Sequence, residues 1–310
     1  MSLSTAILRP LTLGIAEHRL TRRIVTGSRP GRAVASRFVA GETLGQAMSS
    51  AASLDRRRIA SMLDFLGENV RTEAQAEIAR AAYLEALAAI PEAPDLDCAI
   101  SLKLTQLGLD MSVDACLANV VPIVEEAARS ATTVMIDMEF VSYVEPTLHV
   151  FREAHARYPK VGVALQSYLR RTEGDLDTLP AGARIRLVKG AYLEPPEVVY
   201  PTKREVDASF ARLFTTLLAR GHAIDVATHD PRLLEGVRRR VDAAGEGWSR
   251  VEFQMLYGVR RDLQTRFAGQ GYPVRVYVPY GTEWYPYLTR RLAERPANVW
   301  FFLSNLLRIR

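Results

Sequence analysis

The sequence predicts an α/β fold, a (β/α)8 barrel that follows a short helical segment. The main observation is that eight short, apolar, β-branched runs alternate with amphipathic stretches of helical period. Barrels of this kind typically take about 250 residues, which this chain of 310 residues can supply. A doubly wound parallel sheet is the alternative. It usually carries a glycine-rich turn after an early strand, and neither a G-x-G-x-x-G nor a P-loop pattern occurs here.

The elements follow one another in a regular order. Residues 1–55 mix short helical patterns with turn signals and contain no clear strand, so we expect a helical N-terminal segment there and a catalytic barrel over 56–310. The predicted strands are Ile59–Leu66, Ala99–Leu104, Thr133–Met138, Val161–Gln166, Arg184–Lys189, His222–Thr228, Arg250–Leu256 and Val274–Val278. The plainest helices are Thr72–Ile90, Val113–Ser130, Glu145–Tyr158, Arg204–Arg220, Pro231–Ala244 and Arg260–Gly269.

Composition limits the class of protein. The chain is 48% hydrophobic and 24% charged, as expected of a globular protein rather than a disordered one. Its net charge of +5 comes with no basic stripe carrying interleaved aromatic residues, so we expect no nucleic-acid partner.

The two cysteines, Cys98 and Cys116, have neither disulfide nor metal spacing and suit a reducing cytoplasm. No segment has the length of a membrane span, so any membrane association would be loose and peripheral.

Polar side chains stand where the predicted strands end. In a (β/α)8 barrel the chemistry takes place at the carboxyl ends of the strands. Three of the four lysines, Lys103, Lys189 and Lys203, fall at or just beyond such ends. The complete set of strand-end residues is Glu68, Lys103, Asp137, Glu139, Gln166, Lys189, Thr228, His229, Gln254 and Tyr277. We therefore expect a polar site at this end of the barrel.

A short C-terminal helix carries two adjacent arginines. We expect it to begin at Pro286, which suits a first helical turn, and to place Tyr287, Arg290, Arg291 and Glu294 on one face. Guanidinium groups bind carboxylates through two parallel hydrogen bonds, so the pair is suited to a small anion. The alternative is a solvated helix face with an i,i+4 ion pair.

The segment Arg186–Tyr192 is a candidate cofactor platform. Arg186 and Val188 share one face of a strand, and Gly190 allows the backbone to approach a ligand closely. The alternative is that the charges of this strand pair with Asp137 or Glu139 inside the barrel.

Two other classes of function remain open on residue chemistry alone. Lys189 could form a Schiff base in a lyase or aldolase, with Arg290 and Arg291 binding the anionic part of the substrate. A non-enzymatic basic module that binds anionic polymers is the second alternative. His229 has no second histidine or cysteine at ligand spacing, so we predict no metal site.

Six segments in order along the chain resemble the proline dehydrogenase family: Ile136–Glu139, Val163–Tyr168, Arg186–Tyr192, Ala227–His229, Glu252–Gly258 and Val276–Glu294. The resemblance begins near Phe38 and runs to the C-terminus. It implies a distorted TIM-type barrel with a C-terminal helix over its mouth, holding non-covalent FAD. It also implies oxidation of L-proline to Δ1-pyrroline-5-carboxylate, with electrons passed to a quinone. The chain is too short for an aldehyde dehydrogenase module, so pyrroline-5-carboxylate dehydrogenase would be a separate downstream enzyme.

The resemblance also assigns roles to residues. Lys103, Arg290 and Arg291 would hold the proline carboxylate, and Arg186 would approach flavin N5. Asp137 would orient Tyr277 and Arg186, which makes these six the expected catalytic residues. The implied substrate site comprises Lys103, Tyr192, Leu256, Tyr277, Tyr287, Arg290, Arg291 and Glu294. The implied cofactor site comprises Asp137, Met138, Ala164, Gln166, Arg186, Val188, Gly190, Ala191, Thr202, Lys203, Thr228, His229 and Gln254.

Three further positions carry hypotheses. Glu68 could pair with Arg291 as a gate over the site. Asp230 stands where the family often has asparagine, which would alter hydrogen bonding near the adenine end of the cofactor. Tyr257 stands where histidine is frequent, which would alter the floor of the pocket.

Overall fold

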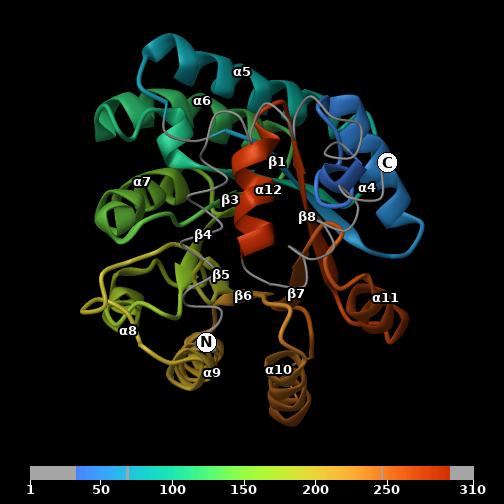
Figure 1. Cartoon of the computed structure of the whole chain (residues 1–310), viewed down its shortest axis with the longest axis vertical. Helices are drawn as coiled ribbons and strands as arrows, with labels where there is room; N and C mark the ends of the chain where they lie inside the picture. The colour runs from blue at the N-terminus through green and yellow to red at the C-terminus, as the bar shows by residue number, and fades with distance from the viewer. Residues whose placement is uncertain (1–32, 68–69, 246, 294–310) are drawn as a thin grey trace, which may run out of the picture.

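The computed structural model describes residues 33–67, 70–245 and 247–293, which form a closed barrel of parallel strands in sequence order (Figure 1). The strands are β1 (Ala60–Phe65), β2 (Cys98–Leu102), β3 (Val134–Ile136), β4 (Val161–Gln166), β5 (Arg184–Val188), β6 (Ala223–Ala227), β7 (Val251–Leu256) and β8 (Val274–Tyr280). All eight predicted strands are present. Since β1 pairs with β8, the sheet closes, which confirms the barrel and excludes the doubly wound alternative.

Helices surround the barrel. They are α4 (Leu44–Asp55), α5 (Glu73–Ala89), α6 (Val113–Arg129), α7 (Val144–Arg157), α8 (Thr172–Asp175), α9 (Lys203–Ala219), α10 (Pro231–Ala244), α11 (Arg261–Gly269) and α12 (Trp284–Ala293), with 3-10 turns η1 (Leu104–Leu107), η2 (Val141–Tyr143) and η3 (Leu176–Thr178). The six predicted barrel helices agree with the structure to within one residue at each end. Their boundaries follow from side-chain caps: Thr72, Ser112, Thr202 and Asp230 each accept a hydrogen bond from a first-turn N–H.

The two faces of the barrel wall differ in chemistry. Outward side chains such as Ile100, Val163 and Leu187 are fully buried against the helices and form the main hydrophobic core. The alternating inward positions, and those just beyond the strand ends, are largely polar: Asp64, Ser101, Lys103, Asp137, Gln166, Arg186, Asp225, Glu252, Gln254, Arg275 and Tyr277. Most barrels of this type fill the interior with apolar side chains. Here Met62, Ala99 and Met135, packed with Tyr277, form a small apolar cluster within it.

The helix α12 crosses the mouth of the barrel (Figure 1). It begins at Trp284, so the expected start at Pro286 is wrong. Trp284 is buried in a hydrophobic cluster with Phe38 and Val39, and its indole N–H donates to Glu42. The first helical N–H groups have no partner within the helix, so Pro286 is tolerated two residues after the start. The N-terminal segment therefore fixes the base of α12.

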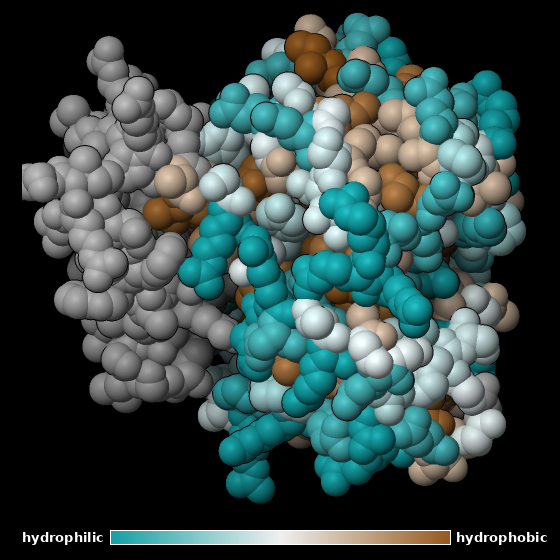
Figure 2. Space-filling model, turned by 90° about the vertical axis from the view of Figure 1, so that its right-hand side faces the viewer, coloured by the Kyte–Doolittle hydropathy of each residue, from teal (hydrophilic) through white to brown (hydrophobic). Residues whose placement is uncertain are grey.

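Some sequence expectations fall outside the described residues. Glu68 and Glu294 are among them, so the proposed gate and one substrate-site residue have no structural description. No helix within the described ranges is long and apolar enough to span a bilayer. On the face that carries α4 and α11, Figure 2 shows hydrophobic residues scattered among hydrophilic ones.

Candidate active site

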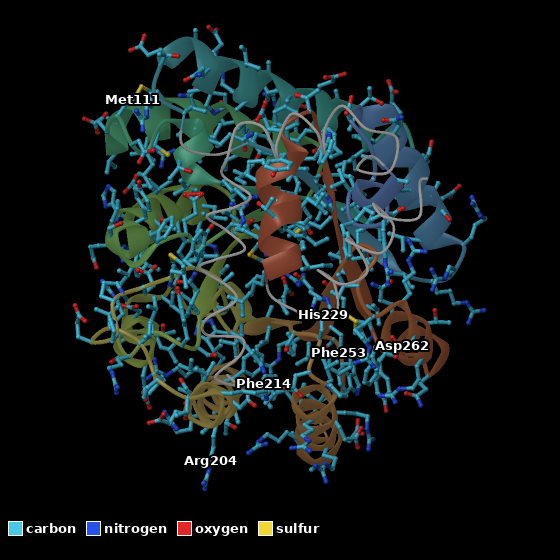
Figure 3. The ribbon with its side chains drawn as sticks, in the orientation of Figure 1. Met111, Arg204, Phe214, His229, Phe253 and Asp262 are labelled. Atoms are coloured by element: carbon cyan, nitrogen blue, oxygen red, sulfur yellow. The ribbon has the colours of Figure 1, made fainter. Side chains whose placement is uncertain are left out.

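A cavity of about 560 Å³ lies at the carboxyl ends of the strands, and α12 covers one side of it. In Figure 3, His229 at the end of β6 lies near the centre of the molecule, whereas Arg204 of α9 points outward. The predicted site residues on the cavity wall are Lys103, Asp137, Met138, Ala164, Gln166, Arg186, Val188, Gly190, Ala191, Tyr192, Lys203, Thr228, His229, Gln254, Leu256, Tyr277, Tyr287, Arg290 and Arg291.

Thr202 and Tyr257 are not part of the wall. The Thr202 hydroxyl accepts from the Glu205 N–H in a capping box at the start of α9, and its place in the cofactor site stays a prediction. The Tyr257 ring lies beneath the guanidinium of Arg261 instead of on the pocket floor. Both side chains serve local structure.

Asp137 is the centre of a network that crosses the barrel. Its Oδ1 lies 2.5 Å from Arg186 Nη1 and accepts from Ser101 Oγ at 2.9 Å. Its Oδ2 accepts from the Tyr277 hydroxyl at 2.7 Å. Burial raises the pKa of Asp137, but Lys103 and Arg186 outweigh it and lower the pKa overall. Asp137 is therefore held as a carboxylate that aligns a cation and a hydroxyl.

Lys103 projects from the end of β2 into the same network. Its Nζ lies 2.5 Å from Asp64 Oδ1, 3.0 Å from the Tyr277 hydroxyl oxygen and 3.4 Å from Asp137 Oδ2. The ammonium also lies 5.7 Å from the centre of the Tyr277 ring. A primary ammonium is thus fixed on the cavity wall by three different strands.

All three guanidinium nitrogens of Arg186 make contacts within the barrel. Its Nε donates to Gln254 Oε1 at 2.8 Å, and its Nη1 donates to Ser101 as well as to Asp137. Nη2 contacts the Met62 sulfur. The side chain is 4% exposed, so a buried cation with a fixed direction faces the cavity. Arg186 pairs with Asp137, as the alternative interpretation expected, and the same residue lines the cavity; the cofactor platform stays a prediction.

The opposite wall offers groups for a large polar ligand. Gln166 donates from Nε2 to the carbonyls of Met138 and Glu139, while its buried Oε1 accepts no hydrogen bond from the described residues. An unpaired buried acceptor on a cavity wall suits a ligand with an N–H donor. Gly190 has φ +113°, and a Cβ there would lie 2.2 Å from the Tyr168 ring. The backbone conformation and the Tyr168 ring therefore favour glycine at this position.

Two lysines and two carboxylates lie together beside the cavity. Lys189 Nζ contacts Asp207 Oδ1 at 2.6 Å and Asp230 Oδ2 at 3.0 Å. Lys203 Nζ contacts the same Asp230 oxygen at 2.8 Å. Burial raises the pKa of Asp230, but hydrogen bonds from Lys203 and Lys189 lower it well below its usual range. A Schiff-base lysine has to be a neutral amine, so these ion pairs disfavour the lyase alternative.

The helix α12 contributes cationic side chains to the cavity wall. Tyr287, Arg290 and Arg291 line the wall, and the guanidinium carbon of Arg291 lies 5.2 Å from the centre of the Tyr287 ring. Together with Lys103 on the barrel, they place three cationic side chains on the wall of the same cavity. This arrangement is suited to a carboxylate.

The sequence interpretation missed Asp64, Ser101 and Met62. All three are inward residues that contact Lys103 or Arg186 without lining the cavity. The one signal for Asp64 was an acidic residue in the middle of an apolar strand, which is costly unless it is paired. Within the described ranges, no group of three His, Cys, Asp or Glu side chains is arranged to hold a metal ion.

The comparison with known proteins is decisive for the family. The family model for proline dehydrogenase matches residues 47–303. The chain belongs to the proline dehydrogenase family. It is 40% identical over 281 residues to proline dehydrogenase from Deinococcus radiodurans, covering 89% of this chain and 90% of that protein. It is 39% identical over 275 residues to proline dehydrogenase 1 from Bacillus subtilis subsp. natto, covering 88% and 91%.

Solved structures of longer proteins share the fold of this chain. Proline utilization A from Bdellovibrio bacteriovorus, inactivated by N-propargylglycine, superposes with a TM-score of 0.78 at 24% identity. The match covers 84% of this chain and 32% of that one. The bifunctional protein PutA of Klebsiella aerogenes is 28% identical over 318 residues, and the match spans 24% of its length. This chain is therefore similar to one part of those longer proteins.

Proposed function

We propose that this protein is an FAD-dependent proline dehydrogenase that oxidises L-proline to Δ1-pyrroline-5-carboxylate and passes electrons to a quinone. The observation that carries the proposal is one cavity lined both by Lys103, Arg290 and Arg291 and by the buried polar side chains of Gln166 and Arg186. A zwitterionic amino acid and a flavin need such an arrangement. The 35–40% identity to monofunctional proline dehydrogenases supports the same activity and a separate enzyme for the next oxidation.

The proposed substrate clamp consists of Lys103, Arg290 and Arg291. Two guanidinium groups on α12 and an ammonium at the end of β2 can bind a carboxylate from two directions. The rings of Tyr277 and Tyr287, with Leu256, form an apolar wall on which the pyrrolidine ring can rest. Because both ends of a small substrate are held, its C5 hydrogen is presented in a single orientation.

The residues of the cofactor wall fit a flavin. Gln166 offers the unpaired buried acceptor, and Arg186 offers a fixed buried cation. Lys203, at the N-terminus of α9, and Lys189 offer cations to phosphate groups. FAD, when bound there, would supply the hydride acceptor and the route for electrons to the quinone. A cation near a flavin stabilises the anionic reduced form, which is the proposed role of Arg186.

The protein contributes orientation and charge to the proposed reaction. Asp137 keeps the hydroxyl proton of Tyr277 directed at its Oδ2, so the hydroxyl oxygen is left to accept from Lys103. This fixes Lys103 against the substrate carboxylate. Hydride can leave C5 only when the nitrogen lone pair is available, so the proline amine has to be neutral in the reacting complex.

The visible spectrum of the purified protein tests the proposal. Flavin bands that bleach on anaerobic addition of L-proline, and return with a soluble quinone, are the expected result. The bleaching rate should rise with pH as the proline ammonium loses its proton. Absence of flavin after incubation with FAD would refute the cofactor, and a flavin that stays oxidised with proline would refute the substrate.

A further inference from the structure

Asp64 is a fully buried carboxylate for which the proposed reaction has no direct use. It lies on β1, is 0% exposed and does not line the cavity. Its Oδ1 lies 2.5 Å from Lys103 Nζ, while its Oδ2 accepts no hydrogen bond from the described residues. A buried charge is costly unless it is paired: burial raises the pKa of Asp64, and the charge of Lys103 is the largest influence that opposes this rise.

The other groups around Lys103 are already engaged elsewhere. Asp137, beyond the end of β3, lies 3.4 Å from Lys103 Nζ but only 2.5 Å from Arg186 Nη1. Tyr277 from β8 is neutral as a hydrogen-bonded phenol and donates to Asp137. Tyr83 from α5 donates to Gln106. Among the described residues of α12, those that line the cavity are Tyr287 and the two cations Arg290 and Arg291. Among the described carboxylates near Lys103, Asp137 also pairs with Arg186, whereas Asp64 forms an ion pair with Lys103 alone.

We propose that Asp64 is a positioning residue that keeps the Lys103 ammonium charged and directed at the substrate carboxylate while the substrate amine is neutral. This inference rests on the proposed function. The two requirements conflict in ordinary solution, because conditions that deprotonate a secondary ammonium also begin to deprotonate a lysine. Burial lowers the pKa of Lys103, but Asp64 leads the contributions that raise it well above its ordinary value.

The charge of Lys103 can be measured without flavin or substrate. The chain contains four lysines, so protein labelled with ¹³C,¹⁵N-lysine gives few Nζ signals, and Lys103→Arg assigns the one of interest. We expect the wild-type Lys103 signal to stay in its charged form to the alkaline limit of folding. In Asp64→Asn its pKa should fall by about 1 to 3 pH units, the usual influence of one nearby charge.

Two comparisons make this measurement specific. Exposed Lys160 serves as an internal reference in every sample. Asp225→Asn is the matched control, because Asp225 is also 0% exposed and pairs with Arg184, not with Lys103. Asp225→Asn should leave the Lys103 titration unchanged. A wild-type Lys103 that loses its proton at or below about 10.4, the ordinary value, would overturn the proposal without any variant.

A second measurement asks whether the charge matters for substrate binding. Tetrahydrofuran-2-carboxylate, a ring carboxylate without the amine, can be titrated into the flavin-loaded protein and followed by the flavin spectrum. Its dissociation constant should be flat with alkaline pH in the wild type. In Asp64→Asn it should rise about tenfold per pH unit above the lowered lysine pKa, since only charged lysine binds the probe tightly.

The outcomes separate the two proposals. If Asp64→Asn shifts the Lys103 titration but the probe binds with the wild-type pH profile, Asp64 has only a structural role and the inference fails. If wild-type protein binds flavin and is reduced by proline while Lys103 titrates identically in both proteins, the inference fails and the proposed function stands. Protein that binds no flavin defeats the proposed function, and a positioning role in that reaction falls with it.

Discussion

The hydroxyl of Tyr277 lies 2.7 Å from Asp137 Oδ2 and donates a hydrogen bond to it, which joins β8 to the end of β3 across the barrel. The same hydroxyl oxygen accepts from Lys103 at 3.0 Å. A single phenol thus connects the carboxylate that aligns Arg186 to the ammonium proposed to hold the substrate. Changes at this connection should alter the substrate site and leave the fold intact.

Replacing Tyr277 with Phe removes one donor and one acceptor from buried charged groups. Each such loss typically costs about 1 to 3 kcal/mol, so we expect kcat/KM for proline to fall by roughly 10- to 100-fold while FAD remains bound. Anaerobic stopped-flow reduction of the flavin measures this. Tyr280→Phe is the matched control, because Tyr280 is a buried tyrosine of the same strand that does not line the cavity. Equal losses in both variants would contradict the assignment.

Replacing Arg291 with Ala should weaken proline binding. A hydrogen bond to a charged group contributes about 1.5 to 3 kcal/mol, so KM should rise by roughly 10- to 150-fold with the flavin spectrum unchanged. Arg240→Ala, an exposed change on α10, controls for the loss of one positive charge. A KM that is equal in the two variants would show that Arg291 does not contact the carboxylate.

Replacing Gly190 with Ala should destabilise the cofactor wall. The positive φ alone costs about 1 to 3 kcal/mol, and the added Cβ would also lie 2.2 Å from the Tyr168 ring. Gly182→Ala shares the positive φ, at +71°, but meets no atom within 4 Å, so it isolates the steric part. We expect Gly190→Ala to have the lower Tm of the two and the weaker affinity for FAD by fluorescence quenching. Similar values would mean that the Tyr168 ring moves aside easily.

Replacing Asp137 with Asn should reduce stability in a pH-dependent way. Removing one partner from a buried ion pair costs about 3 to 5 kcal/mol, because Arg186 and Lys103 lose a shared counter-charge. Although burial opposes it, Lys103 and Arg186 lower the pKa of Asp137. Its stabilising contribution is therefore fully present above the unfolded value of about 3.9 and is lost as pH falls through the lower folded value.

Urea unfolding of the wild type and Asp137→Asn checks this at several pH values. The difference in free energy of unfolding should be constant over roughly pH 5 to 8 and should shrink only below about 3.9. Asp177→Asn breaks an exposed ion pair with Arg220 and should cost about 0 to 1 kcal/mol. A difference that shrinks near neutral pH would indicate that another group is responsible.

Local patterns in the sequence were sufficient to predict the barrel and the polar residues at the ends of its strands. Strand and helix periods differ, and caps such as Thr72 and Asp230 fix where helices begin, so element boundaries follow from nearby residues. Because parallel strands of a barrel end at one face, residues such as Lys103 and Gln254 had to meet there. The start of α12 was predicted wrongly at Pro286, because contacts of Trp284 with Phe38 and Glu42, far away in the sequence, are not visible in a local pattern.

The pairing of these residues was decided by the closed barrel. Which inward side chains meet depends on strand register and on distances across the barrel, and neither is encoded in a local pattern. Asp64 and Lys103 are 39 positions apart, and Tyr277 and Asp137 are 140 apart. The sequence by itself determined the alternation, the helix ends and the polar character of one barrel mouth. The tertiary structure decided which charge neutralises which, because burial makes every unpaired charge costly.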